Sequence, residues 1–119
     1  MTGWLSTHVL DTAQGRPGAG IPVALYRLDE AGRATLVVAT ETNADGRTDD
    51  PLLAGADFTV GAYELRFHVG DYFRRAGLAT AEPAFLDLVP IRFAIADAGA
   101  HYHVPLLASP WNYTTYRGS

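Results

Sequence analysis

The chain has 119 residues, of which 48% are hydrophobic and 18% charged, and its formal net charge is −4. This length and composition predict one globular domain over residues 1–119 and exclude a disordered chain. The chain contains no cysteine and no block of Lys and Arg, which excludes a disulfide framework and a thiol nucleophile and argues against nucleic acid or an anionic membrane as partner.

Short β-type runs, separated by turn signals, follow one another along the chain. The expected strands cover residues 4–11, 21–28, 34–42, 61–69, 88–96, 101–108 and 112–116. Between the third and fourth of these, Asp45 and Gly46 predict a tight turn. Residues 71–77 predict one or two helical turns, since they begin with an acidic residue and end at a glycine. Seven short strands with one brief helix are typical of a β-sandwich.

Polar side chains gather on one predicted sheet face, because side chains alternate along a strand with period two. If the apolar side chains of strands 4–11 and 101–108 face the core, then His8 and His103 face outward, and Tyr116 of the last strand joins them. The same face carries the apolar residues Leu10, Pro105 and Leu107. A partly apolar outer face of this kind indicates that a second subunit covers it.

Each of these residues also has an ordinary structural interpretation. A strand histidine is most often a surface or packing residue, and we interpret His68 in this way. Arg47 follows a turn, where most arginines are only solvated. His101 and His103 point the same way and are spaced as metal ligands can be, but no third ligand with suitable spacing follows, so no metal site is predicted. From the residues alone, the chain is a β-sandwich with a polar face.

Five motifs, LSTHVLD at residues 5–11, GRPG at 15–18, TNADGR at 42–47, HYHVPLL at 101–107 and YRGS at 116–119, together resemble the transthyretin-like family. LSTHVLD at residues 5–11 and GRPG at 15–18 are similar to the family's N-terminal signature. TNADGR at 42–47 lies where the family has a turn arginine. HYHVPLL at 101–107 and the terminal YRGS at 116–119 resemble the hydrolase branch of the family. The resemblance covers essentially the whole chain.

The resemblance implies an all-β, transthyretin-like sandwich of two four-stranded sheets with one short helix. It also implies a homotetramer with active sites at the dimer–dimer interface. The implied reaction is hydrolysis of 5-hydroxyisourate to 2-oxo-4-hydroxy-4-carboxy-5-ureidoimidazoline in urate breakdown, without a cofactor or a metal. The residues that match the family's catalytic set are His8, Arg47, His103, Tyr116 and Ser119, and those that match its substrate-binding set are His8, Arg47, Tyr116, Arg117 and Gly118.

These side chains suit the opening of an acyl C–N bond by water. A neutral imidazole can take a proton from water, because its ordinary pKa lies close to neutral pH. A guanidinium stays charged and can stabilise a developing oxyanion. We therefore expect His103 or His8 to be the general base, with the other as orienting group or proton shuttle, and Arg47 to bind the substrate's oxygens. Tyr116 would orient the substrate, and Ser119 would complete the wall of the site.

Two other functions fit a domain of this kind. A transthyretin-fold carrier would bind a small aromatic ligand without turnover. A structural or interaction domain would tolerate alanine at the histidine positions, since fold alone does not determine function.

The expected compartment is the cytoplasm. The N-terminus lacks the basic and apolar regions of a signal peptide, and no apolar run approaches the roughly 20 residues that a membrane span needs.

Overall fold

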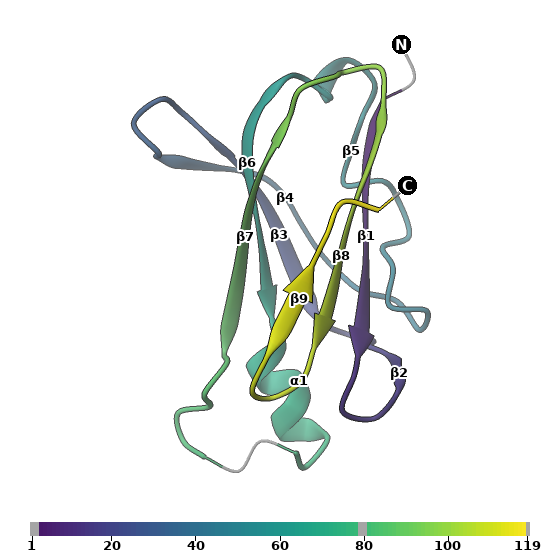
Figure 1. Ribbon diagram of the computed structural model, residues 1–119, viewed down its shortest axis with the longest axis vertical. Coiled ribbons are helices and arrows are strands. Elements are labelled where there is room, and N and C mark those ends of the chain that lie inside the picture. The colour runs from purple at the N-terminus through teal and green to yellow at the C-terminus, as the bar shows by residue number, and fades with distance from the viewer. Residues whose placement is uncertain (1–2, 79–80, 119) are drawn as a thin grey trace.

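Two β-sheets pack face to face in the computed structural model, which describes residues 3–78 and 81–118 (Figure 1). One sheet has the strand order β2 (Arg16–Pro17), β1 (Trp4–Asp11), β8 (His101–Ala108) and β9 (Tyr113–Thr115), with β5 (Leu53–Ala54) also paired to β1. The other has the order β4 (Ala34–Glu41), β3 (Pro22–Leu28), β6 (Gly61–His68) and β7 (Leu88–Ile95). The predicted sandwich is therefore confirmed, with the two-residue strand β5 in addition to four strands in the first sheet.

The short helix α1 (Val69–Arg75) lies at one end of the sandwich, and a 3-10 turn, η1 (Gly55–Asp57), precedes β6 (Figure 1). The helix begins two residues before the predicted Asp71. Its first residues, Val69 and Gly70, are buried, and the Gly70 amide donates to the Asp87 carbonyl at 3.0 Å. Packing of the first turn therefore decides where the helix begins. Within the described residues, no helix is long and apolar enough to cross a membrane.

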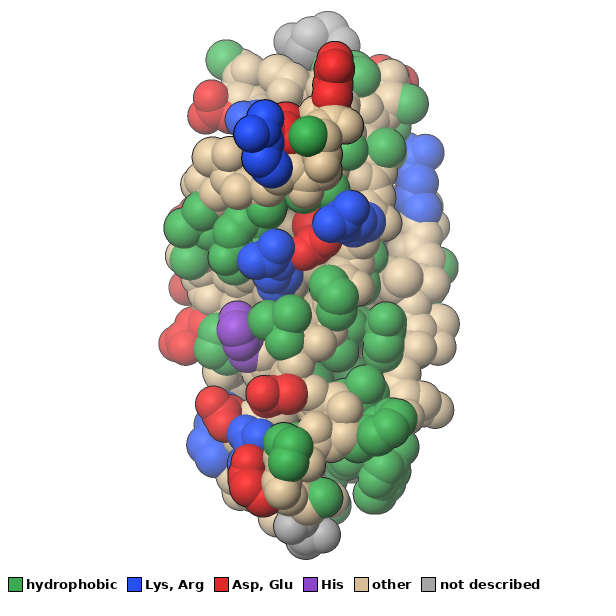
Figure 2. Space-filling view, turned by 90° about the vertical axis from the view of Figure 1, so that its left-hand side faces the viewer, with side chains coloured by type: hydrophobic (Ala, Val, Ile, Leu, Met, Phe, Trp, Pro, Cys, Tyr) green, Lys and Arg blue, Asp and Glu red, His purple; other side chains and the backbone are tan. Residues whose placement is uncertain are grey.

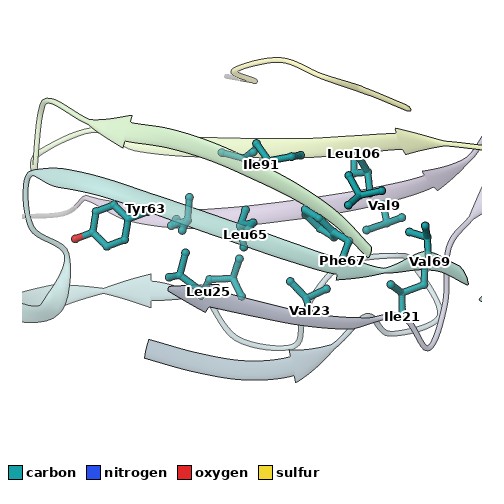
Figure 3. Close-up of a cluster of buried hydrophobic side chains, with 14 of the residues drawn as sticks. Val9, Ile21, Val23, Leu25, Tyr63, Leu65, Phe67, Val69, Ile91 and Leu106 are labelled. Atoms are coloured by element: carbon teal, nitrogen blue, oxygen red, sulfur yellow. The ribbon is translucent and has the colours of Figure 1, made fainter. Parts of the chain in front are cut away.

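The core lies between the sheets and is built from the inward side chains of both (Figure 3). Its labelled members are Val9, Ile21, Val23, Leu25, Tyr63, Leu65, Phe67, Val69, Ile91 and Leu106. Each is almost fully buried, and burying a side chain of this size contributes about 1.5–3 kcal/mol. Ile21 precedes β3 and Val69 begins α1. The other positions alternate along their strands, so the intervening side chains point outward.

Strands β1 and β8 are parallel neighbours, and their register determines which outward side chains meet. Trp4 lies opposite His101, and Ser6 lies opposite His103. The two strands lie at opposite ends of the sequence, so their pairing depends on the whole fold. It brings an aromatic ring, a hydroxyl and two imidazoles together on one outer face.

The outer face of the other sheet carries interspersed charges of both signs (Figure 2). On it, the buried Glu64 carboxylate accepts from Arg66 Nε at 2.6 Å and from Arg92 Nε at 2.7 Å. The exposed His68 lies at the end of β6 and makes no side-chain cap for α1. These ion pairs neutralise the buried Glu64 carboxylate. We therefore assign this face no part in the site.

Candidate active site

The turn between β4 and β5 is held against β1 by one glycine (Figure 1). The Asn43 side-chain oxygen accepts from the backbone N–H groups of Asp45 at 2.9 Å and Arg47 at 3.2 Å. Gly46 has φ 77°, and a Cβ there would lie 2.4 Å from the Val9 carbonyl oxygen. Only glycine combines this left-handed backbone with such a close approach. The Val9 amide donates to the Gly46 carbonyl at 2.7 Å, and the turn is thereby fixed to the strand.

This contact places Arg47 opposite His8 in an isolated β-bridge. His8 Nε2 lies 2.9 Å from the Asp45 carbonyl oxygen. Because a carbonyl only accepts, the hydrogen of this bond sits on His8 Nε2, and Nδ1 is the nitrogen left to accept a proton.

His101 and His103 share one hydroxyl. Ser6 Oγ lies 2.7 Å from His101 Nε2 and 2.8 Å from His103 Nδ1. Trp4 stacks on His101, with ring centroids 3.6 Å apart and planes inclined by 8°. The two imidazoles are therefore held in fixed orientations on the outer face of β8.

A hollow of about 390 Å³ opens beside these groups, a size within the range of small-molecule sites. Its walls are Trp4, Ser6, Thr7, Arg47, Thr48, Asp49, Asp50, Pro51, His101 and His103. Segment 47–51 forms one wall and strands β1 and β8 form the floor. His8 lies on the same face of β1, next to this hollow, with its ring held by the turn.

The surroundings of His103 disfavour a positive charge. Burial lowers the pKa of His103 most, and the positive charge of Arg47 and the neighbouring His101 and His8 lower it further. His103 is therefore neutral at neutral pH and can accept a proton.

The C-terminal segment packs directly on His103. The Gly118 amide donates to the His103 carbonyl at 2.7 Å. A Cβ on Gly118 would lie 2.6 Å from His103 Cδ2, so the ring lies where a side chain at 118 would be.

Tyr116 and Arg117 are the first two residues of the terminal motif. They line a second hollow, of about 200 Å³, formed with residues of β7 and β8. The Arg117 guanidinium lies over the Tyr102 ring, 4.0 Å from its centroid. Within one chain the structure thus brings His8, Arg47 and His103 together with Gly118, while the Arg117 guanidinium packs on Tyr102. Ser119 lies outside the described residues.

Sequence reasoning missed the role of Ser6 and Trp4 in this site. Ser6 shares the outward face of β1 with His8, which is the signal that the sequence offers. Its bonds to the histidines depend on the pairing of β1 with β8. In residues 3–78 and 81–118, no group of three or more His, Cys, Asp or Glu side chains is arranged to hold a metal ion.

Comparison with known proteins gives consistent matches over nearly the full length. Residues 5–118 match the model of the HIUase/Transthyretin family. The chain is 60% identical over 118 residues to "5-hydroxyisourate hydrolase 2" of Rhizobium meliloti (strain 1021), covering 99% of this chain and 98% of that protein.

Two solved structures also align with the chain. The Klebsiella pneumoniae 5-hydroxyisourate hydrolase structure aligns with TM-score 0.80 at 34% identity, covering 98% of this chain and 99% of that chain. The crystal structure of (S)-allantoin synthase aligns with TM-score 0.93 at 48% identity; the match covers 99% of this chain but 44% of that chain.

Proposed function

The chain belongs to the HIUase/transthyretin family, and from that premise we propose that it hydrolyses 5-hydroxyisourate. Its relatives identify it as a hydrolase. The proposed product is 2-oxo-4-hydroxy-4-carboxy-5-ureidoimidazoline. The observation that supports the reaction best is that His103 and Arg47 line the same hollow, where burial and the charge of Arg47 hold the pKa of His103 below its ordinary value.

We assign the general base to His103 in preference to His8. His103 lines the hollow, and its lowered pKa keeps it in the neutral form that a base needs. His8 is bound through Nε2 to the Asp45 carbonyl, which suits an orienting group or a proton shuttle.

The proposed reaction needs only water and these side chains. His103 takes one proton from water as the oxygen bonds to the acyl carbon of the substrate ring. The carbonyl oxygen becomes an oxyanion, which the positive charge of Arg47 stabilises. When the oxyanion collapses, the C–N bond breaks, and the departing nitrogen takes the proton that His103 received.

Arg47 is suited to this part because its guanidinium is not neutralised by a neighbouring acid. Its side chain is exposed, and it makes no ion pair within the part of the chain that the structure describes. Its charge is therefore available to substrate oxygens.

We further propose a homotetramer with active sites at the dimer–dimer interface. Trp111 is 68% exposed and Tyr116 is 58% exposed in the single chain, and exposed aromatic side chains of this size are common at protein interfaces. In such an assembly, Tyr116 and Arg117 would complete a substrate site formed by more than one chain, and Ser119 would close its wall.

The test generates 5-hydroxyisourate in solution with urate oxidase and follows its ultraviolet absorbance with and without the protein. Decay faster than the spontaneous rate, lost in His103→Asn, supports the hydrolase. Saturable binding of the substrate without faster decay would support the carrier in its place. Near-normal turnover by a well-folded His103→Asn variant would remove His103 from the mechanism.

A further inference from the structure

We propose that Ser6 is a positioning residue that holds His103 in the tautomer protonated on Nδ1, and that His101 fixes the direction of the Ser6 hydroxyl. The consequence for catalysis rests on the proposed function. The choice of tautomer rests on it as well, but the tautomer is a property of the free protein and can be measured without the reaction.

The three groups are placed by the parallel pairing of β1 and β8. Ser6 lies opposite His103 in the register, and His101 lies two residues earlier on the same face of β8. Ser6 Oγ is 2.7 Å from His101 Nε2 and 2.8 Å from His103 Nδ1. Both distances are those of full hydrogen bonds, so one hydroxyl joins two imidazoles.

Counting hydrogens leaves two arrangements for neutral rings. Ser6 has one hydroxyl hydrogen, and its oxygen also accepts. In the first arrangement, His103 Nδ1–H donates to Ser6, and Ser6 donates to His101 Nε2. In the second, His101 Nε2–H donates to Ser6, and Ser6 donates to His103 Nδ1.

The two arrangements have opposite effects on catalysis. The first leaves His103 Nε2 without a hydrogen, and therefore able to take a proton from water. The second puts a hydrogen on His103 Nε2, and the neutral ring then has no free nitrogen for a base. The proposed reaction therefore requires the first arrangement, in which His101 is the acceptor.

The surroundings favour a fixed arrangement. Trp4 stacks on the flat face of His101 and restrains the plane in which Nε2 meets Ser6. On the other side, the Gly118 backbone packs against His103 Cδ2. Within residues 3–78 and 81–118, no hydrogen bond reaches His103 Nε2, and that side of the ring is left for water or substrate.

The same bond serves both states of His103. When His103 Nε2 takes a proton, Nδ1–H still donates to Ser6, and this bond stabilises the imidazolium without moving the ring. Ser6 thus resembles the orienting member of a catalytic triad in its role, with a hydroxyl in place of a carboxylate.

The first test is the tautomer of His103, read from the nitrogen shifts of ¹⁵N-histidine-labelled protein by NMR at a pH where the ring is neutral. We expect Nδ1–H in the wild type and in Ser6→Thr, which keeps the hydroxyl. Ser6→Ala should shift His103 toward the Nε2–H form, and so should His101→Phe, which keeps the stack on Trp4 but accepts no hydrogen bond. Thr35→Ala removes an exposed hydroxyl from β4 in the other sheet and serves as the control.

The second test is kinetic. A general base contributes about 10²–10⁴-fold to a rate, and we expect Ser6→Ala to lose roughly tenfold to a hundredfold of it in kcat, with KM changed by less than about twofold. Ser6→Thr should restore most of kcat, and Thr35→Ala should match the wild type. A rise in KM alone would indicate a substrate contact and overturn the positioning role.

The two tests separate failure of this inference from failure of the proposed function. Nε2–H in the wild type, or the same tautomer in wild type and Ser6→Ala, would overturn the inference whatever the activity. Unchanged kcat in Ser6→Ala would overturn it as well. If the wild type itself does not hydrolyse 5-hydroxyisourate, the proposed function fails, while the NMR result still decides the tautomer. Should Ser6→Ala not fold, Ser6→Thr and His101→Phe carry the same comparison.

Discussion

At the scale of single residues, the pKa of His103 is determined by its burial and by the charges around it. Burial is the largest cause of its lowered pKa, followed by the positive charge of Arg47 and by His101 and His8. Each cause opposes formation of the imidazolium. The ring nevertheless stays in contact with the hollow, so a neutral base is available to water.

This environment predicts the acidic limb of the pH profile. Because the neutral form of His103 is the proposed base, kcat/KM should fall as pH drops through the pKa of His103, with a midpoint below the ordinary value of about 6.5. Arg47→Gln removes a repelling charge and should move that midpoint upward, besides lowering the rate. The measurement is kcat/KM against pH for both proteins, with Arg33→Gln, which removes an exposed charge in the β3–β4 turn, as control. A wild-type midpoint at or above 6.5 would contradict the assignment.

The second prediction at this scale concerns Gly118. The His103 ring occupies the space that a side chain at position 118 would need. In Gly118→Ala the new Cβ would lie 2.6 Å from His103 Cδ2, so the ring or the C-terminal segment must shift. A displacement near 1 Å can cost roughly a hundredfold in rate, and we expect kcat/KM to fall by that order with little change in Tm.

The matched control for Gly118→Ala is Gly15→Ala. Gly15 has φ 70°, and a Cβ added there would have no other atom within 4 Å, so alanine strains the backbone by about 1–2 kcal/mol without a clash. It should lower stability and leave kcat/KM unchanged. Full activity in Gly118→Ala would show that the segment moves freely over His103.

At the scale of elements, the end of β1 is joined to α1 by one carboxylate. Asp11 is buried, and its oxygens accept from the Tyr72 hydroxyl at 2.7 Å and from Gln14 and Ala13 in the following loop. Burial alone would raise the pKa of Asp11, but the hydrogen bonds from Tyr72, Gln14 and Ala13 together hold it below its ordinary value. The ionised form is therefore the one that stabilises the fold.

Tyr72→Phe tests this link. Removing a hydrogen bond to a charged group should lower the free energy of unfolding by about 2 kcal/mol near neutral pH. Since the folded pKa of Asp11 is depressed, this stabilisation is complete above the unfolded value of about 3.9 and is lost as pH falls through the lower folded value. Urea denaturation at neutral pH and in acid should show the difference from wild type shrinking, with Tyr113→Phe, which changes an exposed tyrosine of β9, as control. A difference independent of pH would indicate a loss of packing only.

Sequence patterns predict which elements this protein forms better than they predict which of those elements lie side by side. Period-two alternation is sufficient to predict seven of the described strands, but it gives no signal for the two-residue strands β2 and β5. It also predicts the outward direction of His8 and His103, because one face of β1 and one face of β8 are buried. Alternation carries no information about which strands pair, and the bonds of Ser6 arise from the pairing of β1 with β8. The YRGS motif is continuous in the sequence, yet Arg117 stacks on Tyr102 while Gly118 packs on His103, since successive residues of an extended segment point to opposite sides.

At the scale of the whole molecule, one chain supplies the proposed base and the proposed arginine but leaves Trp111, Tyr113 and Tyr116 exposed. The hollow beside His103 is open to solvent on the outer face of the sheet. Tyr116 and Arg117, which the family resemblance places in the substrate site, line the separate hollow between β7 and the sheet of β8. We propose that a second copy of the chain covers this open face.

The proposed homotetramer predicts a mass of about 51 kDa by size-exclusion chromatography with light scattering, four chains of 12.8 kDa. Trp111→Glu places a charge on the exposed turn between β8 and β9. Because desolvating an unpaired charge opposes association, the measured mass and the hydrolase activity should fall together. Val60→Glu is the matched control, since Val60 is also an exposed apolar residue, 62% accessible, but lies in the loop before β6. Full activity in a Trp111→Glu protein that runs as a monomer would place the entire site within one chain and contradict active sites at a dimer–dimer interface.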